Sequence, residues 1–456
     1  GGLPFVGVGW YRTEFDVPQF QAGKRATILF DGAMSHANVY INGQKVGYWP
    51  YGYNSFYFDI TKYLKPGEKN TLAVRLENLP ESSRWYPGAG LYRNVHLIIT
   101  EDAYIPVWGT YITTPSVNEK FAKVNVRTKV VLPEGADPAK YSVETSVWNP
   151  NKQKLTAVRT SLAQMKYNNN QAEQEFVIQA PSLWSPEMPA LYSAETRLYE
   201  GDKLKDIYTT PFGIRSIEII PDKGFFLNGK RTVFKGVCNH HDLGPLGAAV
   251  NDAAIRRQIR ILKDMGCNAI RTSHNMPAPE LIRACDEMGM MIMAESFDEW
   301  NVAKCKNGYN LLFDEWAEKD LVNLLHNFRN NPSVVMWCIG NEVPNQWNEG
   351  DCKIAKWLQD ICHREDPTRP VTQGMDAPDA VVNNNFAAVM DVAGFNYRPF
   401  KYKINYKKLP QRIVLGSETA STVSSRGVYK FPVERKAMAK YDDHQASSYD
   451  VEHCGW

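Results

Sequence analysis

The sequence of 456 residues predicts a multidomain protein in which two all-β sandwiches precede a (β/α)8 TIM barrel that lacks its last strand. Three observations lead to this fold class. The chain is too long for a single ordinary hydrophobic core. Its first 217 residues alternate apolar and polar positions with the two-residue period of β-strands. The remaining residues instead alternate short apolar strands with amphipathic helices.

Residues 1–104 carry strand patterns alone. In NVYINGQKVGYW, Val39 and Ile41 alternate with polar residues, and Asn42-Gly43 supplies a tight hairpin turn. The segment FYFDITKYLKPGEKNTLAVRLEN continues this pattern, with KPGE as its next turn. We therefore expect residues 1–104 to form a jelly-roll-like sandwich that is incomplete at its start.

Residues 105–217 form a second strand-rich segment. KVNVRTKVVLP and YSVETSVWN both alternate with period two, and short polar turns separate such runs. A segment of about 110 residues of this kind suits an immunoglobulin-like sandwich. The alternative is one larger sandwich that spans both segments.

From residue 218 onward, helices appear between the strands. The clearest helix is DAAIRRQIRILKDMG, in which Ile255, Ile259 and Leu262 share one face. Asp252 is its expected N-cap, and Gly266 is expected to end it. This alternation of helices with strands is typical of a parallel sheet.

Seven apolar segments supply the predicted strands of this sheet: RTVFKGVC, CNAIRTS, MMIMAES, SVVMWCIGN, RPVTQG, VAGFNY and RIVLGS. So many strand–helix units in regular succession favour a (β/α)8 barrel. The ending YDDHQASSYDVEHCGW is polar and offers no eighth strand. We therefore expect residues 218–456 to form a barrel that is incomplete at its end.

Composition narrows the classes of partner. The formal net charge of +2 gives no support to nucleic-acid or membrane-surface binding. No run approaches the ~18 consecutive apolar residues of a membrane span, and GGLPFVGVGW does not have the pattern of a signal peptide. We expect neither a nucleic acid nor a membrane as partner. The sequence leaves the compartment open between periplasm and cytoplasm.

Polar and charged side chains follow almost every predicted barrel strand. Barrel enzymes place their active sites at these carboxyl ends, so the pattern predicts a polar pocket rich in carboxylates. In chain order the side chains are His240, His241, Asp242, Arg271, His274, Glu295, Asp298, Glu299, Asn341, Glu342, Asp376, Asn396, Tyr397, Ser417 and Glu418.

Glu342 and Glu418 each directly end an apolar run, after the fourth and the seventh strand. An unpaired buried carboxylate is costly, so such a residue usually has a partner or a task. These two strands are expected to face each other across the barrel mouth. Two facing carboxylates suit cleavage of a glycosidic bond, and a separation of ~5 Å would make one of them a nucleophile. The alternative is that either glutamate only lines the barrel as an ion-pair partner.

Three other motifs give little support to other classes of enzyme. NHHD after the first strand resembles metal-dependent hydrolases with paired histidines, but the ligands required on later strands do not occur. GSETAS lacks the G-x-S-x-G spacing of a nucleophile elbow. PGAGLYR lies in a β domain and is interpreted as a turn, not as a dinucleotide loop.

Several motifs in the same order resemble glycoside hydrolase family 2, which includes β-galactosidases, β-glucuronidases and β-mannosidases. GVGWYRTEFDVP and RWYPGAGLYRNVHL resemble its N-terminal sugar-binding sandwich. PFGIRSIEIIPDKGFFLNGKRTVFKGVCNHHD resembles its junction into the barrel. CNAIRTSHNMP, MWCIGNEVP, GFNYRP and VLGSETAS resemble its active-site strands. The resemblance covers essentially the whole chain.

The resemblance implies roles for individual residues. Glu342 matches the acid/base and Glu418 the nucleophile of a retaining enzyme, and Asn341 matches the residue that hydrogen-bonds the sugar 2-OH. Arg271 and Tyr397 match groups that orient and polarise the nucleophile. The expected substrate-binding residues are Asn341, His240, His274, Tyr397, Arg271 and Glu295.

The resemblance also raises the question of a metal. Some β-galactosidases of the family hold magnesium through an acid and a histidine after the third strand. Here Glu299 is present, but Asn301 stands where the histidine would be. One carboxylate with a neutral amide is a poor magnesium site, so we expect no cofactor and do not favour magnesium.

The expected function is a retaining exo-β-glycosidase that acts on an oligo- or polysaccharide. β-Galactosidase is the first choice, because KGVCNHHDLGPLG and MAESFDEW resemble β-galactosidase-type members. β-Glucuronidase and β-mannosidase are the alternatives within the family, and a non-catalytic carbohydrate-binding protein is the alternative from another class. Family members often assemble, which leaves a homo-oligomer open.

Overall fold

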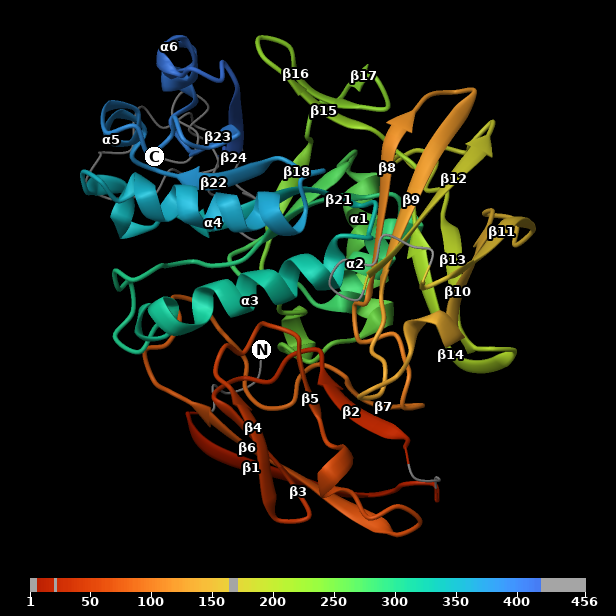
Figure 1. Cartoon of the computed structure of the whole chain (residues 1–456). Helices are drawn as coiled ribbons and strands as arrows, with labels where there is room; N and C mark the ends of the chain where they lie inside the picture. The colour runs from red at the N-terminus through yellow and green to blue at the C-terminus, as the bar shows by residue number, and fades with distance from the viewer. Residues whose placement is uncertain (1–5, 20–22, 164–170, 420–456) are drawn as a thin grey trace.

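The computed structural model describes residues 6–19, 23–163 and 171–419. Within them the chain forms two β-sandwiches and a parallel sheet surrounded by helices (Figure 1). This arrangement confirms the predicted fold class. The predicted lack of an eighth strand in the polar ending lies outside the described residues.

The first sandwich consists of two antiparallel sheets. One has the order β1-β6-β3-β4, with strands β1 (Gly7–Asp16), β6 (Lys69–Asn78), β3 (Ala37–Ile41) and β4 (Gln44–Trp49). The other has the order β5-β2-β7, with strands β5 (Phe56–Asp59), β2 (Arg25–Phe30) and β7 (Val95–Thr100). The β3–β4 hairpin turns at the predicted Asn42-Gly43, where both residues have positive φ angles, as a two-residue hairpin turn requires.

The second sandwich also pairs two antiparallel sheets. One has the order β11-β10-β13-β14, with strands β11 (Lys154–Ser161), β10 (Tyr141–Trp148), β13 (Tyr192–Glu200) and β14 (Lys203–Phe212). The other has the order β12-β9-β8, with strands β12 (Gln171–Gln179), β9 (Phe121–Lys129) and β8 (Thr110–Val117). A small sheet of β15 (Ile217–Ile220), β16 (Gly224–Leu227) and β17 (Lys230–Arg231) leads into the barrel.

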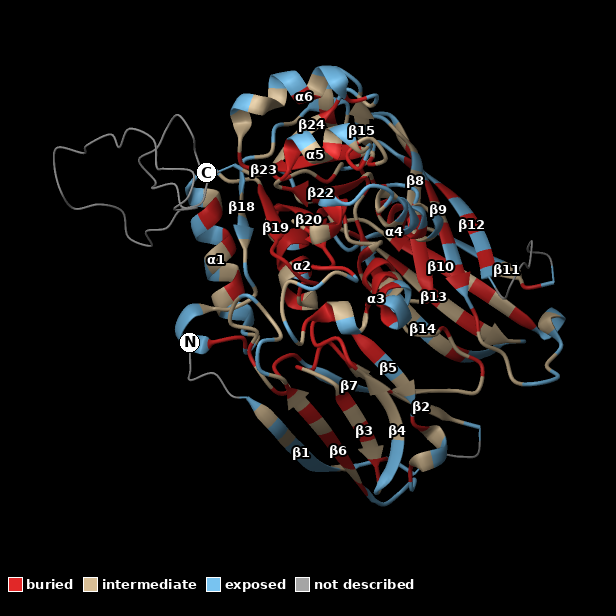
Figure 2. Ribbon diagram, turned by 90° about the vertical axis from the view of Figure 1, so that its left-hand side faces the viewer, coloured by how far each residue is buried: buried red, intermediate tan, exposed pale blue. Residues whose placement is uncertain are grey.

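Seven parallel strands pair in chain order to form the barrel sheet. They are β18 (Gly236–Asn239), β19 (Ala269–Thr272), β20 (Met291–Glu295), β21 (Val334–Asn341), β22 (Val371–Met375), β23 (Val392–Asn396) and β24 (Val414–Glu418). The helices between them are α1 (Asp252–Asp264), α2 (Pro279–Met288), α3 (Phe313–Phe328), α4 (Cys352–Glu365), α5 (Pro378–Asn383) and α6 (Tyr402–Lys408). In Figure 2, β20 and β22 are buried throughout, whereas sandwich strands such as β12 alternate buried and exposed residues.

Helix α1 corrects one local prediction. Its three apolar residues are buried as expected, but the N-cap is Asn251 and not Asp252. The Asn251 side chain accepts the N–H of Ala254 at 2.9 Å. Asp252 is the first helical residue, and its carboxylate instead pairs with Arg256 one turn later at 2.8 Å. Both residues are good caps, so the sequence alone did not distinguish them.

The first sandwich docks on the barrel through a buried carboxylate. Asp320 of α3 accepts hydrogen bonds from Trp49 Nε1 (2.9 Å) and Asn54 Nδ2 (2.6 Å) of the sandwich. It also accepts one from the Tyr309 hydroxyl at 2.5 Å. Burial raises the pKa of Asp320 to about 6. This docking brings the loops of the sandwich to the mouth of the barrel.

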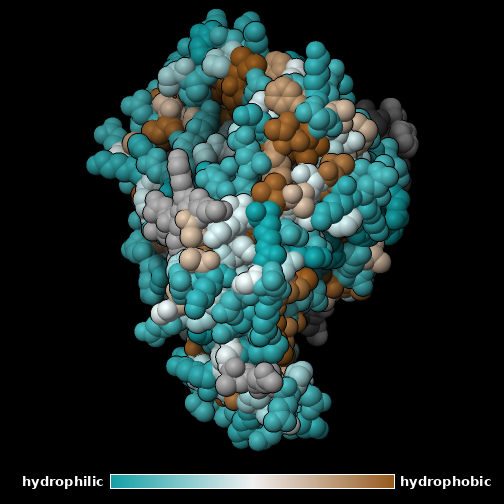
Figure 3. Space-filling model, turned by 45° about the vertical axis from the view of Figure 1, so that its right-hand side comes forward, coloured by the Kyte–Doolittle hydropathy of each residue, from teal (hydrophilic) through white to brown (hydrophobic). Residues whose placement is uncertain are grey.

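Among the described residues, none of the helices is long and apolar enough to cross a membrane. On the face drawn in Figure 3, hydrophilic side chains predominate and hydrophobic ones form small separate groups.

Candidate active site

The carboxyl ends of the parallel strands bring the predicted site residues together. Hydrogen bonds or ion pairs join Arg271, His274, Glu295, Asn341, Tyr397 and Glu418 to one another. Glu342 joins this network through Asn396, and His240 contacts it through the ring of His274. Residues from β18 to β24 thus meet at one edge of the sheet, as the strand pattern predicts.

Arg271, at the end of β19, is the centre of the network. Its Nε lies 2.5 Å from Glu295 Oε2 and its Nη1 lies 2.7 Å from Glu418 Oε1. Its Nη2 donates to Asn341 Oδ1 at 2.9 Å. Burial acts to lower the pKa of this guanidinium, but the surrounding anions, Glu295 first, raise it well above the ordinary value. Arg271 is therefore a permanently charged anchor for three side chains.

Glu418, at the end of β24, has both carboxylate oxygens occupied. Arg271 binds Oε1, and the Tyr397 hydroxyl donates to Oε2 at 2.5 Å. Burial acts to raise the pKa of Glu418, but the charge of Arg271 and the hydrogen bond from Tyr397 outweigh it. The pKa is therefore held below the ordinary value, and the side chain is ionised at neutral pH.

Glu342, directly after β21, is in a different environment. Asn396 Nδ2 donates to its Oε1 at 2.8 Å. Burial, followed by the charges of Asp376 and Glu418, raises the pKa of Glu342 to about 7. Its backbone φ of 44° lies in the left-handed region, which is costly for a residue with a Cβ and common at active sites. Near neutral pH the site thus holds an ionised Glu418 beside a Glu342 that loses its proton only around pH 7.

Asn341 connects the two glutamates. Its Oδ1 accepts from Arg271 and, at 3.1 Å, from Asn396. Its Nδ2 donates to Asp298 Oδ1 at 3.0 Å. Because Asn341 is fully buried, its orientation is set by these neighbours. The amide group predicted to hydrogen-bond a sugar hydroxyl is therefore engaged with Asp298.

Glu295 and the histidines complete the predicted set. Glu295 is 0% exposed, and its carboxylate contacts Arg271 and His274 Nδ1 (2.9 Å). Both contacts are to protein groups, and the role of Glu295 in substrate binding stays a prediction. The rings of His240 and His274 lie edge to face, with centroids 5.4 Å apart. Burial lowers the pKa of both histidines, so both are neutral at pH 7.

The first sandwich contributes residues that the sequence reasoning did not select. Arg84 binds Asp298 through two hydrogen bonds, from Nε at 2.8 Å and from Nη2 at 2.5 Å. The Trp85 ring lies 5.1 Å from the ring of His240 and 5.7 Å from that of His274, centroid to centroid. Both residues belong to the motif RWYPGAGLYRNVHL, which could have indicated them.

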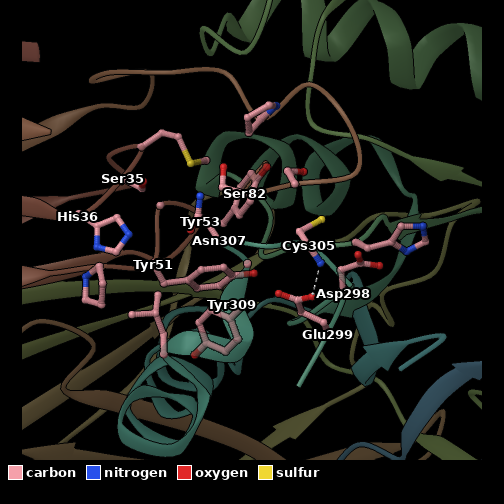
Figure 4. Close-up of a pocket in the computed structure, with 18 of the residues that line it drawn as sticks. Ser35, His36, Tyr51, Tyr53, Ser82, Asp298, Glu299, Cys305, Asn307 and Tyr309 are labelled. Carbon is pink, nitrogen blue, oxygen red and sulfur yellow. Dashed lines mark hydrogen bonds between the residues drawn. The ribbon is translucent and has the colours of Figure 1, made fainter. Parts of the chain in front are cut away.

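A cavity of about 80 Å³ lies between the sandwich and the barrel, beside this site. The sandwich side is lined by Ser35, His36, Tyr51, Tyr53 and Ser82 (Figure 4). The barrel side is lined by Asp298, Glu299, Cys305, Asn307 and Tyr309. Asp298 and His274 belong to both the cavity and the network, so the two spaces are adjacent.

Three family descriptions match consecutive parts of the chain. Residues 4–101 match "Glycosyl hydrolases family 2, sugar binding domain", and residues 104–215 match "Glycosyl hydrolases family 2". Residues 218–450 match "Glycosyl hydrolases family 2, TIM barrel domain". The three matches follow the order of the two sandwiches and the barrel.

Individual relatives support the same family. A protein from Bacteroides ovatus named "Beta-galactosidase BoGH2A" is 39% identical over 100% of this chain and 58% of the relative. A "Putative beta-glucuronidase" from Formosa agariphila is 35% identical over 94% of this chain and 39% of its own length. A solved family 2 member from Bacteroides cellulosilyticus has a TM-score of 0.86 and 36% identity, covering 91% of this chain and 53% of that one. The chain thus spans about half the length of the relatives it matches.

Proposed function

We propose that this chain, which belongs to glycoside hydrolase family 2, is a glycosyl hydrolase and acts as a retaining exo-β-glycosidase. In this proposal Glu418 is the nucleophile and Glu342 the acid/base. The observation that carries it is the contrast between the two side chains. Arg271 and Tyr397 keep Glu418 ionised, while burial and nearby anions keep Glu342 protonated up to about pH 7.

The proposed hydrolysis has two steps, and both depend on the different pKa values of Glu418 and Glu342. Glu418 attacks the anomeric carbon while Glu342 gives its proton to the glycosidic oxygen, and the leaving group departs as an alcohol. A covalent glycosyl-enzyme remains, in which Glu418 is an ester and no longer places a negative charge beside Glu342. Deprotonated Glu342 then takes a proton from water, which attacks the anomeric carbon and releases Glu418. Each glutamate returns to its original state.

The neighbouring residues position these two groups. Arg271 and Tyr397 hold the carboxylate of Glu418 in one orientation, so it loses little freedom on attack. Asn341 is held by Arg271 and Asp298 and is proposed to bind the sugar 2-OH. The rings of Trp85 and the two histidines form one wall of the mouth.

For the sugar we propose a neutral β-galactoside. Among the described residues, the cations in contact with the site carboxylates are already paired. Arg271 pairs with Glu295 and Glu418, and Arg84 and Lys304 both pair with Asp298. A sugar carboxylate needs an uncommitted cation, so this pairing favours a neutral sugar. The name of the Bacteroides ovatus relative supports the same choice.

β-Glucuronidase is the second candidate. Relatives from Formosa agariphila and Bacteroides fragilis bear that name. Arg398, after β23, donates to the backbone carbonyl of Asp376 instead of a carboxylate, so its charge could serve an acidic sugar. A non-catalytic sugar-binding protein would not require two glutamates whose pKa values are shifted in opposite directions.

Hydrolysis of aryl β-galactoside, β-glucuronide and β-mannoside by the intact protein tests the proposal. We expect galactoside turnover, with the Glu418→Gln variant losing at least about 10⁴-fold in kcat. Glucuronide turnover that is lost in this variant would keep the mechanism and change the sugar. If the folded protein hydrolyses none of the three, the exo-glycosidase proposal fails.

A further inference from the structure

The loop after β20 carries the carboxylate at which the family resemblance would place a magnesium ligand. Glu299 Oε1 accepts the backbone N–H of Asn310 at 3.1 Å. Its Oε2 accepts the N–H of Lys304. The same oxygen accepts the N–H of Cys305 at 3.2 Å, which is the hydrogen bond drawn in Figure 4. Glu299 is only 3% exposed. Its two oxygens are thus engaged by donors of its own loop, and it acts as an anchor for that loop.

The surroundings of Glu299 also fail to supply a metal site. A Cβ on Gly308 would lie 1.8 Å from Glu299 Oε1, so the loop closes directly over the carboxylate. Asn301, at the position of the histidine, accepts from Asn345 Nδ2 at 2.9 Å. In the described parts of the chain, no group of three or more His, Cys, Asp and Glu is arranged to hold a metal. These donors do not fit magnesium, which requires several free oxygen ligands.

The same loop also carries Lys304, whose ammonium group lies at the site. Lys304 Nζ donates to Asp298 Oδ1 at 2.9 Å and to the carbonyl of Asn341 at 2.6 Å. Its side chain is 10% exposed. The Asn341 carbonyl belongs to the peptide unit that joins Asn341 to Glu342, so the ammonium lies beside the proposed acid/base. A buried ammonium is tolerated here because a carboxylate and a carbonyl satisfy it.

We propose that Lys304 is a positioning residue that supplies, as a fixed ammonium, the positive charge next to the acid/base, so that the site needs no divalent cation. This inference rests on the proposed role of Glu342. Lys304 would hold Asp298 and the Asn341 backbone in place and balance the anions around Glu342.

The charged groups around Glu342 give the sign of the effect. Asp376 and Glu418 disfavour its ionised form, Lys304 favours that form, and Asn396 hydrogen-bonds it. Arg84, on the sandwich loop, also interacts with its charge. Replacing Lys304 by a neutral residue removes one stabiliser of the ionised form, so the pKa of Glu342 rises. Because a general acid must be protonated, the alkaline limb of the pH profile of kcat/KM moves to higher pH.

The pH dependence of kcat/KM on the best aryl glycoside tests this inference. In Lys304→Met we expect the alkaline limb to move up by about one pH unit and the maximal rate to fall. Lys304→Arg, which keeps the charge, should return the limb toward its original position. Lys306→Met is the matched control, since Lys306 is exposed on the same loop, and it should leave the profile unchanged. A lower rate with an unmoved limb in Lys304→Met would overturn the proposed electrostatic role.

Whether magnesium binds at Glu299 can be tested without measuring glycoside hydrolysis. Calorimetric titration of the chelator-treated protein with Mg²⁺ should give no saturable heat, and chelation should leave the melting temperature unchanged. Saturable Mg²⁺ binding that is lost in Glu299→Gln would overturn the inference. If the wild type hydrolyses no glycoside, the proposed function fails, while this titration still decides whether a metal site exists.

Discussion

The hydrogen bond from Tyr397 to Glu418 allows a quantitative test of the proposed nucleophile. Tyr397→Phe keeps the ring and removes the hydroxyl that lies 2.5 Å from Glu418 Oε2. A hydrogen bond to a charged group contributes about 1.5–3 kcal/mol, and 1.36 kcal/mol corresponds to one pKa unit. Since Arg271 still binds the other oxygen, we expect the pKa of Glu418 to rise by roughly one unit.

The sign of this shift can be read directly in an assay. A nucleophile must be ionised, so a higher pKa of Glu418 moves the acid limb of kcat/KM to higher pH. Tyr402→Phe is a suitable control, because within the described residues the Tyr402 hydroxyl donates to the backbone carbonyl of Phe395 at 3.4 Å and hydrogen-bonds no carboxylate. An acid limb in Tyr397→Phe that coincides with the wild-type limb would refute this reasoning.

Two further predictions concern contacts between the first sandwich and the barrel. Arg84→Met removes two hydrogen bonds from Asp298, and we expect kcat/KM to fall by about 10- to 100-fold. An unchanged kcat/KM would contradict this. Asp320→Ala leaves the donors of Trp49, Asn54 and Tyr309 unpaired, and urea unfolding should show a loss of about 3 kcal/mol. A loss below about 1 kcal/mol would show that the docking contact is dispensable.

Much of the barrel mouth could be predicted because its signals are local. An apolar strand followed by a carboxylate places that carboxylate at the carboxyl end of the strand. Glu342 directly follows β21, and Glu418 is the last residue of β24. Arg271 lies near the end of β19, and Tyr397 directly follows β23. Parallel pairing then brings together side chains that are far apart in the chain.

The rest could not be predicted because it depends on contacts between distant segments. Arg84 and Asp298 are 214 residues apart, and only the docking of the sandwich on the barrel brings them together. The role of Glu299 depends on the path of a loop with no periodic pattern. Lys304, a loop residue two positions from another lysine, carries no signal that separates it from a solvated charge.

The pKa values of the two strand-end glutamates are shifted in opposite directions, because burial dominates at Glu342 whereas Arg271 and Tyr397 outweigh burial at Glu418. Arg271 touches Glu418 directly, but Asn341 stands between Arg271 and the side of the site that holds Glu342. Glu342 therefore receives an amide hydrogen bond instead of a charge, with Asp376 and Glu418 as anionic neighbours. The different surroundings of the two carboxylates are what the proposed acid/base and nucleophile roles require. Lys304 opposes the rise in the pKa of Glu342, since it is one of the cations that favour the ionised form of that side chain.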